Sequence, residues 1–493
     1  MTVNRRTVLT SSAAAALAGG PFAGFLSLPA GAVERAGSRY PRSVELLPVP
    51  DERDGRVRLH LPEGFSYRSF HDTDTADGSK VVLDDGTLLP GRHDGMGAFD
   101  GSGETVVLVR NHEVNGSGGA FGPDTPYDPA AGGGTTTIRV TRRGQVLSAY
   151  TSLNGTMMNC SGGVMPWGSW MTCEETVNGP DVGPDFTGQS NTKLQKPHGY
   201  VFEVPVGEWA DRTPITQAGR FAHESVAFDP EGGALYLSED NFAFPSGFYR
   251  YTPRRNPLRT GRLDNKGVLH MLAVKGRPNR HLEKQQEQGR TYDVAWVRID
   301  EPDTVFPYTP GEPAPTPNDT ALNFVGDQGR AKGAAHFSRF EGTVYDNGII
   351  YFTSTQGGGP RETEPSDSAG GYGNGHGQVW GYDPRAMTLT CVYQSPSKET
   401  LDFPDNITTS PRGTLVLCED STGDNYLRGL STTGKLWDIA LNRLRGTVGD
   451  EDRSGDEFAG STFSPDGKTL FVNIQASKGL SFAIWGPWRT IGV

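Results

Sequence analysis

Residues that can bind metal ions recur at the start of one repeated phrase in this chain. The phrase is a polar entry residue, a few small residues, an apolar stretch, a turn rich in Pro, Gly and Asp, and a second apolar run that ends in polar groups. The sixth copy begins with Ala459 and Gly460. The residues that begin the first five copies, here called the openers, are Asp94, Cys160, Glu224, Glu341 and Asp405.

Each copy of the phrase predicts two strands joined by a tight turn. Asn347-Gly348 and the Asp229-Pro-Glu-Gly232 and Ser464-Pro-Asp-Gly467 segments have residues that such turns require. Six hairpins in the same phase predict an all-β, six-bladed β-propeller, because a blade needs roughly 40 to 50 residues. An array of β-sandwich type is the alternative.

Further strand-like pieces lie between the copies, at residues 198–204, 247–251 and 378–383, and are expected to form outer strands. The 117-residue interval between Glu224 and Glu341 predicts an insertion around residues 253–330. We expect a helix-tolerant run at 281–290 and a Pro-rich surface loop at 301–317. A seventh blade in this interval is the alternative.

A propeller would gather the openers, because its inner strands line a central channel and begin on one face. Four carboxylates and one thiol at one place repel each other when ionised, so a metal is expected among them. Carboxylate oxygens favour Ca²⁺, Mg²⁺ or high-valent iron, and a thiolate suggests a transition metal. The alternatives are turn acids that face solvent and Cys160 as a covalent nucleophile.

Acidic residues also close the phrases. If the second strand of each hairpin returns to the opposite face, these residues lie far from the openers. They would then bind separate Ca²⁺ ions or cap turns. The set comprises Glu113, Glu174, Glu175, Glu239, Asp240, Glu419 and Asp420.

Arg339 precedes Glu341 by two residues, so the two side chains lie on one side of an extended entry. A guanidinium beside a metal suits bidentate binding of phosphate. An ion pair that only holds Glu341 in place is the alternative. The chain has no Gly-x-Ser-x-Gly, His-Glu-x-x-His or Walker motif.

Composition agrees with an all-β protein. The 493 residues include 66 Gly and 35 Pro, which favours many short elements over a helical bundle. A net charge of −12 argues against nucleic acid as a partner. Four cysteines indicate no disulfide scaffold.

The N-terminus has the pattern of a twin-arginine export signal. Arg5-Arg6 precedes an apolar stretch over residues 8–28, and Ala30-Gly31-Ala32 resembles a cleavage site. We expect a signal peptide over 1–32, the twin-arginine translocation machinery as a partner, and one catalytic domain over 33–493. A weak membrane anchor is the alternative. No later segment is apolar enough to cross a bilayer.

The chain resembles the PhoX-type alkaline phosphatases over about residues 50–480. The resemblance rests on Asn159–Glu175 with its Cys-Ser-Gly-Gly, Pro-Trp-Gly and Cys-Glu-Glu strings, on Gly219–Glu224 and on Ser464–Gln475. Asn111-His112-Glu113 and Arg339-Phe340-Glu341 also match, although Phe340 stands where Pro is more usual.

This resemblance implies a six-bladed propeller that hydrolyses phosphate monoesters outside the cytoplasm. It implies ferric iron (Fe3+) and calcium (Ca2+) at the channel mouth and small phosphate esters as substrates. The irons would be held by Cys160, Glu224, Glu341 and Asp405. Arg339 would bind the phosphate, with Asn159 as a further substrate-binding residue. The remaining metal ligands would be Asp94, Glu174, Glu175, Glu239, Asp240 and Glu419.

In the expected reaction the cations polarise the phosphate, Arg339 holds the transferring group, and no protein nucleophile is required. Two other classes stay open: a calcium-dependent propeller esterase or lactonase, and a non-catalytic binding propeller. Because one chain supplies the whole mouth, a monomer is expected.

Overall fold

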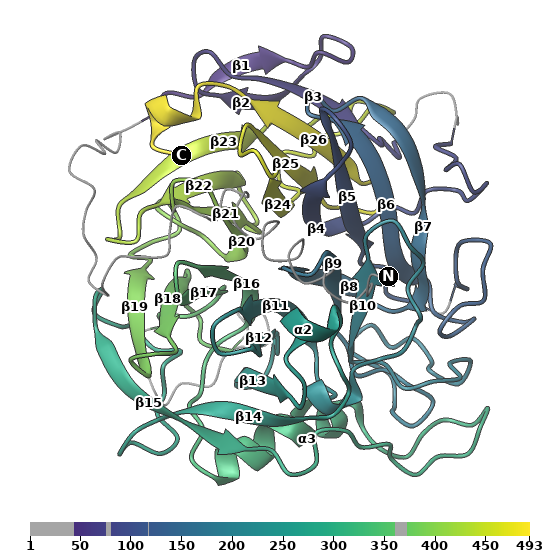
Figure 1. Ribbon diagram of the computed structural model, residues 1–493, viewed down its shortest axis with the longest axis vertical. Coiled ribbons are helices and arrows are strands. Elements are labelled where there is room, and N and C mark those ends of the chain that lie inside the picture. Colours follow the sequence, from purple (N-terminus) through teal and green to yellow (C-terminus); the bar gives the residue numbers. More distant parts are fainter. Residues whose placement is uncertain (1–43, 75–79, 117, 360–371) are drawn as a thin grey trace, which may run out of the picture. The chain divides into compact units, whose positions relative to one another are not determined.

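The structure is a computed structural model that describes residues 44–74, 80–116, 118–359 and 372–493. These residues are mostly in strands, as the sequence predicts, and form five hydrogen-bonded sheets round a common centre (Figure 1). The arrangement is propeller-like. Residues 1–32, predicted as a signal peptide, lie outside the described residues. Within the described ranges, no helix has the length and apolar character needed to span a membrane.

The first two sheets follow the order of the chain. One contains β4 (His93–Asp100), β5 (Thr105–His112), β6 (Gly133–Thr141) and β7 (Val146–Thr156). The next contains β8 (Asn159–Met165), β9 (Ser169–Glu174) and β10 (Val201–Pro205).

The third sheet is larger than one blade. In spatial order it contains β11 (His223–Asp229), β12 (Ala234–Glu239), β13 (Phe248–Pro253), β14 (Gly267–Val274), β15 (Thr291–Arg298), β19 (Thr388–Gln394), β18 (Gln378–Asp383), β17 (Ile349–Ser354) and β16 (Phe340–Asp346). Because β15 pairs with β19 through Thr291 and Thr390, two predicted blades share one sheet. The hydrogen bonds therefore form five sheets and not the six separate sheets that the sequence predicts.

The last two sheets are completed by the first strands of the chain. One contains β20 (Pro404–Thr409), β21 (Leu415–Glu419), β22 (Tyr426–Leu430), β23 (Leu436–Asn442), β2 (Val57–Leu61) and β1 (Leu47–Pro50). The other contains β24 (Phe458–Phe463), β25 (Thr469–Ile474), β26 (Leu480–Trp485) and β3 (Ser66–Phe70). Distant parts of the sequence therefore close the ring of sheets.

The predicted insertion around 253–330 is only partly an insertion, because it supplies β14 and β15. It also contains α2 (Pro257–Thr260) and α3 (Asn318–Ala331). The run 281–290, expected to tolerate a helix, is not helical, whereas 301–317 is irregular as expected. Two short 3-10 helices, η2 (Thr216–Ala218) and η3 (Trp488–Ile491), complete the elements.

The six predicted hairpins form, and their turn residues explain why. Asn347 and Gly348 both have positive φ, 49° and 86°, as a two-residue turn between β16 and β17 requires. Between β20 and β21, the Ser410 hydroxyl accepts hydrogen bonds from the backbone N–H groups of Arg412 and Thr414.

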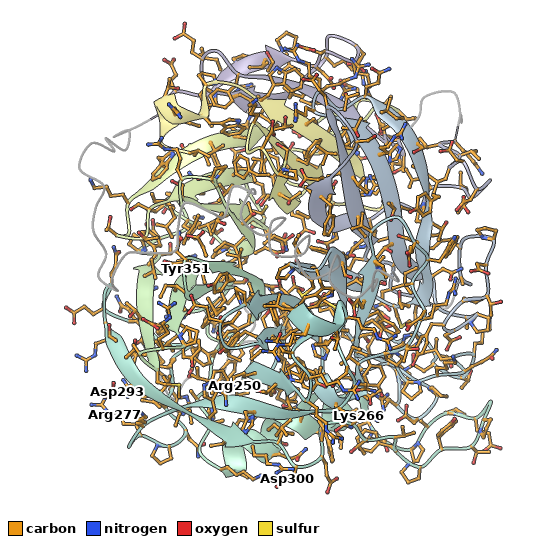
Figure 2. The ribbon with its side chains drawn as sticks, viewed as in Figure 1. Arg250, Lys266, Arg277, Asp293, Asp300 and Tyr351 are labelled. Carbon is orange, nitrogen blue, oxygen red and sulfur yellow. The ribbon has the colours of Figure 1, made fainter. Side chains whose placement is uncertain are left out.

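The first strands of these hairpins form the inner ring. They are β4, β8, β11, β16, β20 and β24; each contacts the next, and β24 contacts β4. Aromatic side chains fill the space between neighbouring hairpins. Phe248 of β13 stacks on Phe352 of β17 with ring centroids 4.1 Å apart. Charged side chains such as Arg277, Asp293 and Asp300 lie instead at the outer margin near β14 and β15 (Figure 2).

A buried ion pair holds the N-terminal strands together. Arg58 of β2 contacts Asp51 at 2.8 Å, and both side chains are fully buried. The Asp51 carboxylate also accepts hydrogen bonds from the N–H and hydroxyl of Ser69 in β3. This carboxylate therefore links the loop between β1 and β2 to β3, the strand that completes the last sheet.

We expect Arg58→Ala to lower the free energy of unfolding by about 3–5 kcal/mol, because it leaves Asp51 buried without its counter-charge. Arg298→Ala is the matched control, since Arg298 and Asp300 form an exposed pair at 3.7 Å and its loss should cost less than about 1 kcal/mol. Chemical denaturation of both variants measures the difference. Equal stability of the two would contradict the role given to Asp51.

Candidate functional site

Every inner strand has a β-bulge close to its first residue. In β4 the pairing passes from His93–His112 directly to Met96–Arg110, so Asp94 is unpaired. Equivalent interruptions follow Asn159, His223, Phe340, Pro404 and Ala459 in the other inner strands. A bulge redirects side chains. Here it places all five openers at the end of the ring where the inner strands begin, which we call the mouth.

Buried side chains fix the backbone of four openers. Each donor lies on the second strand of a neighbouring hairpin and is fully buried. The hydrogen bonds run from Asn473 to the carbonyl oxygen of Asp94 (2.6 Å), from Asn111 to that of Cys160 (2.9 Å), from Ser238 to that of Glu341 (2.6 Å) and from Thr353 to that of Asp405 (2.6 Å). The openers are therefore held by contacts between hairpins.

After two of the openers, Asp94 and Glu341, the next residue must be glycine, because the next inner strand lies close to it. A Cβ on Gly95 would lie 2.5 Å from the Cα of Ser161, and one on Gly342 would lie 2.5 Å from the backbone nitrogen of Ile407. Real Cβ atoms do not approach so closely. This close packing brings the openers of adjacent strands together.

The second strand of each hairpin returns to the mouth, because the two strands are antiparallel. It does not end at the opposite face. The residue that follows it donates a backbone hydrogen bond of 2.9–3.1 Å to the residue just before the inner strand. The pairs are Glu113 to Arg92, Glu175 to Met158, Asp240 to Ala222, Thr355 to Arg339, Asp420 to Phe403 and Gln475 to Glu457.

Openers, closing residues and Glu457, which directly precedes β24, gather in three overlapping groups. Within each group the possible ligand atoms lie within 4.8 Å of one another. The groups are Cys160 with Glu175 and Glu224, Glu224 with Glu341 and Asp405, and Asp405 with Asp420 and Glu457. Glu224 and Asp405 each belong to two groups, so the three form one continuous set that can hold metal ions. Five residues predicted from the sequence are in it: Cys160, Glu175, Glu224, Glu341 and Asp405.

The structure does not bring Glu174, Glu239 or Glu419 into these groups. They lie one residue before the closing residues, so their side chains point to the other face of the strand. Each carboxylate accepts hydrogen bonds from backbone N–H groups. These groups lie at or near the start of the next strand in the sheet, which is β10, β13 or β22. The donors are Gly199 and Tyr200 for Glu174, Gly247 for Glu239, and Tyr426 for Glu419. These three glutamates therefore connect strands.

Two other predicted residues lie next to the groups. Asp94 is at the mouth, where its carboxylate accepts a hydrogen bond of 2.5 Å from the Gln475 amide. The buried amide of Asn159 accepts from Thr156 and donates to Thr172, at 2.6 and 3.0 Å. These bonds occupy the Asn159 side chain, so the structure gives it no contact for a substrate.

The sequence analysis did not select Glu457 and named Asp420 only among the closing acids. Glu457 precedes the sixth phrase, which has no acidic opener. Its backbone occupies the position that Arg339 occupies before β16, as the equivalent hydrogen bonds show. Alignment of the residue two positions before each phrase, in addition to the opener, would have singled out Glu457 as the one acid there.

Burial and like charges oppose ionisation across the mouth. Burial first, and neighbouring carboxylates second, raise the pKa values of Glu224 and Glu341 well above the ordinary range. They raise the pKa of Asp405 to about 8. Among the described residues, neither carboxylate oxygen of Glu224 has a hydrogen-bond partner. A buried carboxylate without a hydrogen-bond partner, beside further acids and a thiol, is part of a donor set that cations would stabilise.

The Cys160 thiol is not an independent nucleophile here. Burial raises its pKa well above the usual value, and the nearby carboxylates of Asp94, Glu224 and Glu175 raise it further. A thiol in such surroundings stays protonated unless a cation lowers its pKa. This favours a ligand role over covalent catalysis.

Arg339 is held by two acids of the mouth. Its Nη2 donates to Asp240 at 2.7 Å and to Glu341 at 3.0 Å, and Nε also donates to Asp240. Within the described ranges, Nη1 has no hydrogen-bond partner. Phe242 lies against the guanidinium, with its ring centroid 5.2 Å from Cζ. The pair predicted between Arg339 and Glu341 is present, and one edge of the guanidinium remains for another ligand.

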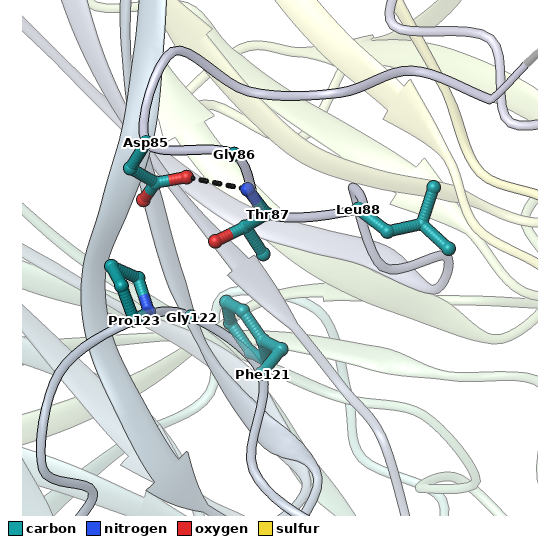
Figure 3. Close-up of a pocket in the computed structure, with 7 residues that line it drawn as sticks. All are labelled: Asp85, Gly86, Thr87, Leu88, Phe121, Gly122 and Pro123. Atoms are coloured by element: carbon teal, nitrogen blue, oxygen red, sulfur yellow. Dashed lines mark hydrogen bonds between the residues drawn. The ribbon is translucent and has the colours of Figure 1, made fainter.

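A surface hollow near the loop before β4 is unrelated to the mouth. It is lined by Asp85, Gly86, Thr87, Leu88, Phe121, Gly122 and Pro123 (Figure 3). The Asp85 carboxylate there accepts a hydrogen bond from the Thr87 N–H at 2.9 Å. None of the predicted site residues lines this hollow.

The fold is similar to those of solved structures. Pseudomonas fluorescens PhoX in complex with vanadate, described as a transition state analogue, has 16% identity and a TM-score of 0.62, with 91% of this chain and 98% of that chain covered. This likeness concerns the fold. A Dyadobacter fermentans protein of unknown function (7% identity, 85% and 99% covered, TM-score 0.42) and a Xanthomonas campestris gluconolactonase (11%, 90% and 100%, 0.35) are less similar.

No curated protein matches the sequence. The profile of one protein family, Alkaline phosphatase PhoX, matches residues 45–478. Since that span covers most of the 493 residues, the chain belongs to the PhoX alkaline phosphatase family.

Proposed function

We propose that this phosphatase hydrolyses phosphate monoesters outside the cytoplasm with ferric iron and calcium bound at the mouth. The observation that carries the proposal is the buried Glu224 carboxylate, whose oxygens have no hydrogen-bond partner in the described part of the chain. It lies in ligand groups with a thiol on one side and two carboxylates on the other. A mixed set of this kind suits a transition metal next to a hard cation.

The metal ligands proposed for iron are Cys160, Glu224, Glu341 and Asp405. The carboxylates proposed for calcium are Glu175, Asp420 and Glu457, which lie at the two ends of the continuous set. When bound, such cations polarise phosphate oxygens and neutralise the charge that develops during phosphoryl transfer.

Arg339 orients the substrate. Asp240 and Glu341 fix its guanidinium through Nε and Nη2. Because the guanidinium is planar, these contacts also fix the direction of Nη1, which donates to a phosphate oxygen. A guanidinium that is already held loses little conformational freedom when the phosphate binds. With Cys160 engaged as a metal ligand, its sulfur would not be free to attack the phosphorus, so the residues of the chain bind and orient the ester without forming a bond to it.

The architecture is proposed to be six blades, each headed by one inner strand. The nine-stranded sheet then consists of two blades joined at their outer edges by β15 and β19. All members of the three ligand groups come from one chain. We therefore propose that the monomer is active.

A first test is elemental analysis of protein exported by its native host, together with turnover of p-nitrophenyl phosphate. We expect iron and calcium, and loss of at least about 100-fold in kcat in Cys160→Ala, because the ligand set is broken. Cys391→Ala is the matched control, since Cys391 is equally buried but lies in β19. Calcium alone, with ester but not phosphate hydrolysis, would contradict the proposal.

A second test uses metal removal and pH. The raised carboxyl pKa values mean that the folded, metal-free protein keeps protons that the unfolded chain releases. Its stability should therefore fall as pH rises, over about pH 4 to 8 for Asp405. Thermal melts of the chelated full-length protein between pH 5.5 and 9 should show this fall, and added metal should reverse it.

Asp405→Asn is the control for this effect, because it removes one of the groups that release a proton. Its chelated form should lose less stability between pH 5.5 and 9 than the parent. A melting temperature that stays level or rises with pH in the chelated parent would count against the electrostatic account.

A third test concerns export. We propose that residues 1–32 are a twin-arginine signal and that the mature chain begins at Val33. Arg5→Lys together with Arg6→Lys should keep the protein in the cytoplasm, and mass spectrometry of the exported parent should give the mature N-terminus. Lys80→Arg is a control outside the signal. Export of the double variant at the parent level would overturn the assignment.

A further inference from the structure

A second arginine occupies the position of Arg339 on another inner strand. Arg92 directly precedes β4, as Arg339 directly precedes β16, and each lies two residues before an opener. The Arg92 carbonyl accepts from the Glu113 N–H at 3.0 Å, and the Arg339 carbonyl accepts from the Thr355 N–H at 2.9 Å. The two arginines are therefore structurally equivalent.

Both residues have a backbone conformation that side chains rarely adopt. The φ angle is 46° at Arg92 and 34° at Arg339. Met158 and Phe403, which directly precede β8 and β20, also have positive φ, 47° and 49°. The left-handed backbone therefore recurs at this position of the ring, and of the six residues there only Arg92 and Arg339 carry a guanidinium.

The two arginines stand on opposite sides of the mouth. The inner strands contact one another in the order β4, β8, β11, β16, β20 and β24. Two strands separate β4 from β16 in either direction round this ring, and the strands lie on different sides of the centre in Figure 1. Burial raises the pKa of Asp420, and both guanidinium groups act against this shift. They therefore flank the same acidic set.

Arg92 is held like Arg339 but is more open to solvent. Its Nε donates to the Glu113 carbonyl at 2.7 Å, and its Nη2 pairs with the Glu113 carboxylate. The Gln475 amide donates to the same Oε2 oxygen of Glu113 at 2.8 Å. Within the described residues Nη1 has no hydrogen-bond partner, and 41% of the Arg92 side chain is exposed, against 16% for Arg339.

We propose that Arg92 forms a second anion subsite at the mouth, opposite the subsite of the transferring phosphoryl group. The ligand is a second phosphate on the substrate, so the preferred substrates are phosphate esters with two phosphate groups. The inference rests on the proposed phosphatase activity and deepens it. The pair with the buried Glu113 uses Nε and Nη2, so it leaves Nη1 and the exposed part of the guanidinium for a second ligand.

The test compares glucose 1,6-bisphosphate with glucose 6-phosphate as substrates of the full-length exported protein. The parent should have the lower KM for the bisphosphate. In Arg92→Gln the KM for the bisphosphate should rise about tenfold or more relative to that for glucose 6-phosphate, because one charge-assisted hydrogen bond is lost. Arg92→Lys should lie between, since it keeps the charge but not the fixed geometry.

Two controls separate this role from a structural one. Arg385 is an exposed arginine in the turn between β18 and β19, away from the mouth, and it pairs with Glu231. Arg385→Gln should therefore not change the ratio of the two KM values. Arg339→Lys should lower kcat for both substrates. An unchanged KM ratio in Arg92→Gln, or equal loss for both substrates, would overturn the proposal. Failure of the parent to hydrolyse either ester would instead count against the phosphatase activity itself.

Discussion

The close contact between neighbouring inner strands is the constraint on which the mouth depends. Each inner strand begins with a bulge. Buried side chains such as Asn473 and Asn111 donate hydrogen bonds to the carbonyl oxygen of the opener on the next hairpin. A carbonyl fixed in this way orients the side chain of the same residue. The position of one opener therefore depends on the hairpin beside it, and the ring holds its acidic residues only as a whole.

This gathering of acids has an electrostatic cost that explains other features of the site. Burial and mutual repulsion raise the pKa values of Glu224, Glu341 and Asp405. Arg339 and Arg92 offset part of this repulsion from opposite sides, through Asp240 and Glu113. Among the described residues, no arginine pairs with the Glu224 carboxylate, which lies in two of the ligand groups. The centre of the acidic set is thus the place where a cation would stabilise the fold most.

Alternation along the second strands divides the closing acids into two kinds. Glu175, Asp240 and Asp420 lie at the mouth, whereas Glu174, Glu239 and Glu419 point to the other face and hold the start of a neighbouring strand. The sequence places these residues in adjacent pairs and offers both as ligands. Which member of a pair faces the centre depends on how the sheet packs, and period-two alternation alone does not specify that.

The sequence by itself determined the hairpins, the turns between them and the identity of the openers, because turn chemistry and the repeated phrase are local. From these it was possible to expect that Cys160, Glu224, Glu341 and Asp405 come together, as they do. Only the tertiary structure decided that β15 joins two blades, that Glu457 reaches the acidic set and that Arg92 stands opposite Arg339. Each of these depends on contacts between segments far apart in the chain, which no local pattern of residues records.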